Sequence, residues 1–70
     1  MMYLYGASTC ESCDEARDSL LRTPLEFQYV DVSTIPGFEG GIPQLQTEDG
    51  TVLYGLPQII NYIKQMGFRI

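Results

Sequence analysis

Two cysteines, Cys10 and Cys13, stand between a short apolar segment and a segment with helical character, and this arrangement constrains the chain most. They are the only cysteines in the sequence. The free N–H groups and the dipole of a helix N-terminus stabilise negative charge, so a thiolate is favoured at Cys10. Cys13 lies about one helical turn further along the same side, within reach of a disulfide. The thiolate is the reactive form of cysteine, so this C-x-x-C pair indicates a redox site.

Length and composition limit the class of protein. With 70 residues the chain makes one small domain, which we expect to span residues 1–70, and its 44% hydrophobic content is ordinary for a globular protein. The net charge of −5 argues against a nucleic-acid partner and against an anionic membrane surface. No apolar run approaches the ~18 residues of a membrane span. The first five residues lack the length and the basic start of a signal peptide.

These properties predict a cytoplasmic location. In the reducing cytosol a cysteine pair is more often catalytic or metal-binding than structural. A zinc ion needs four ligands and the sequence contains no His, so we expect no metal site.

The first half of the chain predicts a strand, a helix and a second strand. Residues 2–5 form a compact apolar run that ends at Gly6, which is typical of a buried strand. Either Ser8 or Thr9 is expected to cap the following helix, which Thr23-Pro24 ends. Cys13, Ala16 and Leu20 share one face of this helix. Residues 27–32 form the second strand.

The second half predicts an irregular segment, a hairpin and a last helix. Residues 33–41 are rich in glycine and have no helical period. Residues 44–47 and 51–54 flank Glu48-Asp49-Gly50, which predicts a β-hairpin. Pro57 suits the first turn of the last helix, and Gly67 stands where a C-terminal cap glycine belongs. The apolar residues of this helix that repeat at helical spacing are Leu56, Ile59, Ile60, Ile63 and Met66.

Three segments in this order resemble the glutaredoxin branch of the thioredoxin fold. Residues 5–13 resemble the strand, loop and C-x-x-C helix start of that family; Gly41-Ile42-Pro43-Gln44 resembles the segment with its cis-proline; Leu53-Tyr54-Gly55 resembles the turn before its last helix. The resemblance covers nearly the whole chain. It implies an α/β fold (α+β with a mixed sheet) of thioredoxin-like order β-α-β-β-β-α. Its sheet would have four strands in the order 2-1-3-4, with two helices on one face.

The chain departs from this family in two places. Family members usually carry a helix between the second and third strands, and residues 33–41 are too short and too rich in glycine for one. The family also often has a basic residue where Ala7 stands and a double glycine where Tyr54-Gly55 stands, and aspartates are common where Leu56-Pro57-Gln58 follow. We therefore expect a minimal family member that binds glutathione weakly.

The resemblance implies the activity of a thiol–disulfide oxidoreductase. Cys10 would attack a disulfide of a protein or a small molecule, and Cys13 would resolve the mixed disulfide. The residues expected to bind substrate are Thr9, Ile42, Pro43 and Gly55. No cofactor is expected to be bound, and the external reductant is either glutathione or a thioredoxin reductase.

A second function remains open, that of a non-catalytic interaction module with incidental cysteines. Without the missing helix, one sheet face should be open, and period two assigns four residues to it: Tyr3, Tyr5, Gln44 and Gln46. Either a second copy of the chain covers this face, giving a homodimer, or the loop containing Ile35 and Phe38 folds back over it.

Overall fold

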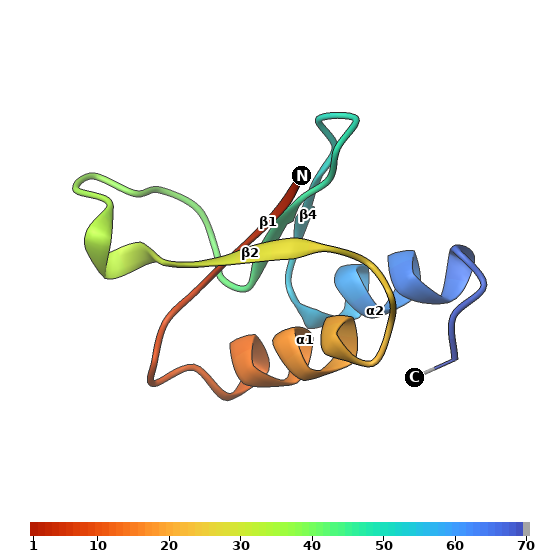
Figure 1. Ribbon diagram of the computed structural model, residues 1–70. Helices are drawn as coiled ribbons and strands as arrows, with labels where there is room; N and C mark the ends of the chain where they lie inside the picture. Colours follow the sequence, from red (N-terminus) through yellow and green to blue (C-terminus); the bar gives the residue numbers. More distant parts are fainter. Residues whose placement is uncertain (70) are drawn as a thin grey trace.

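A four-stranded mixed sheet carries two helices on one of its faces in the computed structural model, which describes residues 1–69 (Figure 1). The strand order is β2-β1-β3-β4, with β1 parallel to β2 and antiparallel to β3. This confirms the predicted fold class and strand order. The elements are β1 (Met2–Gly6), α1 (Glu11–Leu21), β2 (Phe27–Asp31), the 3-10 helix η1 (Val32–Thr34), β3 (Gln44–Gln46), β4 (Val52–Tyr54) and α2 (Leu56–Gln65).

The strand register divides the sheet into a helix face and an open face. Leu4 pairs with Tyr29 on β2 and with Leu45 on β3, and these three residues lie on the helix face. Tyr3 pairs with Gln46 and Tyr5 pairs with Gln44, so these four residues lie together on the open face. The predicted division of both strands is therefore confirmed, because directly paired residues share one face of a sheet.

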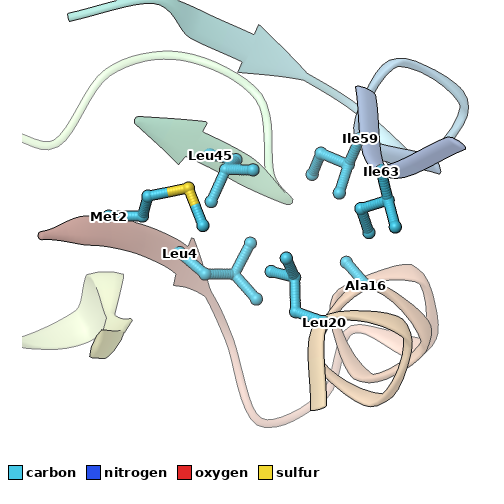
Figure 2. Packing of buried hydrophobic residues seen from close by; sticks show 7 residues of the cluster. All are labelled: Met2, Leu4, Ala16, Leu20, Leu45, Ile59 and Ile63. Atoms are coloured by element: carbon cyan, nitrogen blue, oxygen red, sulfur yellow. The ribbon is translucent and has the colours of Figure 1, made fainter. Parts of the chain in front are cut away.

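The core fills the space between the helix face and the two helices (Figure 2). Its buried side chains are Met2, Leu4, Ala16, Leu20, Leu45, Ile59 and Ile63. The predicted buried face of α1 is confirmed, since Cys13 is fully buried beside Ala16 and Leu20.

The stripe predicted on α2 is only partly correct. Ile59 and Ile63 are buried, but Met66 is 47% exposed because α2 ends at Gln65 and Met66 is its C-terminal cap. The chain then turns at Gly67, where φ is +95°, and Phe68 packs back against the core in place of Met66. Gly67 therefore has the predicted capping role.

The segment after β2 is more ordered than its composition predicts. The strand ends at Asp31, one residue earlier than expected, because the Asp31 side chain accepts a hydrogen bond from the Ser33 N–H at 2.9 Å and caps η1. Residues 35–43 then form the β2–β3 loop. Within the Glu48-Asp49-Gly50 turn, φ at Gly50 is +89°, which suits glycine, and the predicted hairpin of β3 and β4 is confirmed.

The β2–β3 loop folds back over part of the open face. The Phe38 ring packs against Tyr5 with centroids 5.6 Å apart, which confirms one of the two predicted coverings. Gln44 lies on the open face as predicted, but its side chain is only 5% exposed and is therefore not open to solvent. The loop explains its burial, since a Cβ on Gly40 would lie 3.0 Å from Gln44 Nε2. Tyr3 stays 41% exposed, and a second chain on this face remains a prediction.

Phe38 is therefore expected to anchor the β2–β3 loop. Phe38→Ala should lower the free energy of unfolding by about 1–2 kcal/mol, because the ring loses its contact with Tyr5. Chemical denaturation of Phe38→Ala, Tyr5→Ala and the double variant should give a coupling energy of about 0.5–1.5 kcal/mol. Glu39→Ala, an exposed neighbour on the same loop, should leave stability unchanged. Strictly additive effects would show that the two rings do not support each other.

Candidate functional site

The two cysteines form a disulfide at the N-terminus of α1, with their Cα atoms 5.2 Å apart. Cys10 has extended backbone angles and is itself the N-terminal cap of α1, because its Sγ accepts a hydrogen bond from the Cys13 N–H at 3.1 Å. The expectation that Ser8 or Thr9 caps this helix is therefore wrong. Both residues precede the position where the backbone turns, and the sulfur takes the place of a capping hydroxyl.

The two cysteines differ in accessibility. Cys13 is fully buried and lies on the core side of α1, whereas Cys10 is half-buried at the surface. A molecule that approaches from solvent therefore reaches Cys10 first. The Cys13 N–H that donates to Cys10 Sγ belongs to the group of free donors at a helix start, which are positioned to stabilise a thiolate.

The charges around the disulfide are mainly negative. Glu11 and Asp14 lie in the first turn of α1. The nearby Arg17 contacts the Asp14 carboxylate at 3.6 Å and lies 5.1 Å from the centroid of the Tyr29 ring. Burial raises the pKa of the Tyr29 phenol; Arg17 opposes this effect, and Asp14 and Asp31 add to it. Tyr29 therefore stays protonated at neutral pH.

Tyr29 lies next to the buried cysteine, a placement that the sequence did not indicate. A Cβ built on Gly6 would lie 2.5 Å from Tyr29 Oη and 3.0 Å from Cys13 Cβ, so both groups contact the backbone of Gly6. The sequence placed Tyr29 only within the second strand. The position of the ring depends on the register of β1 and β2, which the sequence does not give. Tyr29 pairs with Leu4, so its ring lies on the helix face, toward α1.

Three of the four predicted substrate-binding residues lie together where β3 begins. The Ile42–Pro43 peptide bond is cis, as the resemblance implies, and Pro43 is fully buried. The Gly55 N–H donates a hydrogen bond of 2.8 Å to the Pro43 carbonyl oxygen. Gln44 pairs with Tyr5, so this group stands beside the end of β1 from which the chain continues to Cys10.

Thr9, the fourth predicted residue, is exposed and lines a cavity of about 540 Å³. The cavity is bounded by residues 7–9 before Cys10, by residues 31–33, and by Ile35, Gly37 and Phe38 of the β2–β3 loop. Both strands β1 and β2 end here, and the two segments that follow them lie at the same end of the sheet (Figure 1). The carboxyl ends of parallel strands are a common position for ligand sites. Of the residues that line this cavity, the sequence analysis assigned only Thr9 to substrate binding.

Comparison of the chain with protein-family models, curated proteins and solved structures finds no match. Within residues 1–69 no helix has the length and hydrophobicity needed to cross a membrane. In the same part of the chain, no group of three or more His, Cys, Asp or Glu residues is arranged to hold a metal ion.

The close approach at Gly6 predicts a sharp effect of a single methyl group. Gly6→Ala should lower the free energy of unfolding by about 1–3 kcal/mol, because the new Cβ overlaps Tyr29 Oη. Adding Tyr29→Phe removes that oxygen and should restore part of the loss in a denaturation experiment. Gly41→Ala is the matched control, since a Cβ there has no atom within 4 Å. Equal stability of Gly6→Ala and Gly41→Ala would refute this account of the packing.

Proposed function

We propose that this chain is a minimal glutaredoxin-like thiol–disulfide oxidoreductase. The observation that carries the proposal is the disulfide-bonded pair at the start of α1, with one cysteine at the surface and the other buried. The thioredoxin-like strand order and the cis Ile42–Pro43 bond support it. The reducing cytosol suits this reaction, since a dithiol must be regenerated there after each turnover.

The reaction begins with both cysteines reduced. The Cys10 thiolate attacks one sulfur of a substrate disulfide, the substrate S–S bond breaks, and the first substrate thiolate leaves and takes a proton from water. A mixed disulfide then joins Cys10 to the rest of the substrate. Cys13 gives up its proton and attacks Cys10, which forms the Cys10–Cys13 disulfide and releases the second thiolate. The protein loses two electrons and the substrate gains two.

Local contacts support these roles for the two cysteines. The Cys13 N–H donates to Cys10 Sγ and can keep this contact when Cys10 is a thiolate. Burial of Cys13 keeps external disulfides away from it, so that it reacts within the protein. Ile42, Pro43, Gly55 and Thr9 are the proposed substrate-binding residues, with the backbone of Ile42 as an edge that an extended peptide can pair with.

The external reductant is either glutathione or a thioredoxin reductase. Ala7, Tyr54 and Pro57 replace residues that would contact glutathione in the resembled family, and the protein and glutathione are both negative. A thioredoxin reductase is therefore the better candidate for the reductant than glutathione.

A second candidate function uses the open face. Tyr54 pairs with Gln44 and so shares the open face with Tyr3, and these two side chains are 51% and 41% exposed. Exposed aromatic residues on one face are typical of an interaction surface. In this reading the chain is a non-catalytic module, or a homodimer through that face, and its cysteines are not used.

The cysteine variants separate the two functions. Cys10→Ser should abolish disulfide reduction, whereas Cys13→Ser should retain attack and accumulate a mixed disulfide that mass spectrometry detects after incubation with a disulfide peptide. Ser12→Ala, between the two cysteines, should behave as wild type. A mixed disulfide formed through Cys13 in Cys10→Ser would reverse the assignment, and no reduction by the wild type would favour the interaction module.

Weak glutathione use gives a second kinetic test. The turnover rate should rise linearly with glutathione concentration through the millimolar range without saturation. Ala7→Lys places a cation where the resembled family has one, and should raise the slope of the rate against glutathione concentration by about threefold. Gln65→Lys carries the same charge change on the exposed end of α2 and should have little effect. Saturation of the wild type at micromolar glutathione would contradict the expectation.

A further inference from the structure

The cavity described above has one charged residue in its lining, Asp31. Asp31 Oδ1 accepts the Ser33 N–H, and the side chain is half-buried at the start of η1. Within residues 1–69 the ion pairs join Met1 with Glu48 and Arg17 with Asp14. Asp31 thus lines the cavity, and its carboxylate forms no ion pair with the described part of the chain.

Apolar side chains form another part of the cavity lining, and the fold holds them in place. Ile35 and Phe38 are half-buried, and Phe38 packs against Tyr5. Two backbone hydrogen bonds shape this segment, from the Ile35 N–H to the Val32 oxygen at 3.0 Å and from the Phe38 N–H to the Ile35 oxygen at 3.2 Å. The cavity is therefore formed before any ligand arrives, which is usual for binding sites.

We propose that this cavity is a subsite for the side chain of a lysine or arginine that flanks the disulfide cysteine of a polypeptide substrate. This inference rests on the proposed function and names its substrate class. The aliphatic stem of such a side chain would pack on Ile35 and Phe38, and its charged head would reach Asp31. A carboxylate or an uncharged side chain gains no charge contact there.

The position of the cavity relative to the nucleophile fits this occupant. Thr9 lines the cavity and precedes Cys10 directly. An extended peptide advances by about 3.3 Å per residue. The side chain of a residue one to three positions from the substrate cysteine can therefore reach the cavity while that cysteine reacts with Cys10. The net charge of −5 attracts a cationic chain to the protein as a whole and increases the rate of encounter.

Peptide disulfides test the subsite through the first chemical step alone. Reduced Cys13→Ser protein is mixed with symmetrical disulfides of short peptides that differ at one position beside the cysteine, where they carry Lys, norleucine or Glu. The rate of mixed-disulfide formation is measured by mass spectrometry at low salt. We expect the order Lys, norleucine, Glu, with about a fivefold ratio between Lys and Glu at the favoured position.

Two variants assign the preference to Asp31. Asp31→Asn keeps an oxygen that can accept from the Ser33 N–H, so η1 stays capped, and it should reduce the Lys-to-Glu ratio toward one. Glu39→Gln removes the same charge from an exposed residue of the β2–β3 loop outside the cavity lining, and should keep the ratio.

Three results would overturn the inference. Equal rates for the three peptides would exclude a charge-selective subsite. An equal loss of preference in both variants would assign the effect to the overall charge of the protein. No mixed disulfide with any peptide would refute the proposed function itself, whereas the first two results would leave that function standing.

Discussion

The contact between the first turn of α1 and the end of β1 is the interaction on which the rest of the structure depends. Gly6 has no side chain, so the Cys13 Cβ and the Tyr29 hydroxyl can both approach its backbone. This contact buries Cys13 and leaves Cys10 at the surface as the cap of α1. It also fixes the direction of α1, whose Ala16 and Leu20 then meet Leu4 in the core. In so small a domain the site and the core share the same few residues, which leaves little room to vary either one.

The short β2–β3 loop has two effects that follow from one physical requirement. A sheet with both helices on one face leaves apolar surface on the other, and Phe38 covers part of it by packing on Tyr5. To reach Tyr5 the loop must turn back past the ends of β1 and β2, and the cavity lies where it does so. A longer segment with its own helix would cover more of the open face. The β2–β3 loop that stands in place of such a segment thus contributes to the stability of the sheet and also forms part of the cavity next to Thr9 and Cys10.

The hydrophobic periodicity of the sequence predicted most of the fold, because a period of two in strands and of 3.6 in helices indicates which side of each element is buried. It separated Leu4 from Tyr3 and Tyr5 correctly, and it placed Cys13 on the buried side of α1. It failed where the deciding contact joins distant residues. The burial of Gln44 depends on Gly40 and the loop that precedes it, and the placement of Tyr29 beside Cys13 depends on strand register. The capping role of Cys10 was missed because a sulfur acceptor is not among the usual cap residues.

The carboxylates around the disulfide have two opposite effects in the proposed reaction. They disfavour the Cys10 thiolate, and they favour the approach of a cationic substrate. Each exposed carboxylate at about 10 Å disfavours a thiolate by roughly 0.4 kcal/mol in water, about a third of a pKa unit. A helix N-terminus in such motifs lowers a thiol pKa by on the order of 1–5 units, so the helix outweighs a few carboxylates. The same carboxylates would attract the cationic polypeptide proposed as substrate, and a cation bound next to Asp31 would offset part of their repulsion of a Cys10 thiolate. Under the proposed function, a cationic substrate would therefore add positive charge beside Cys10, so that activation of the thiolate and selection of the substrate would depend on the same electrostatic interaction.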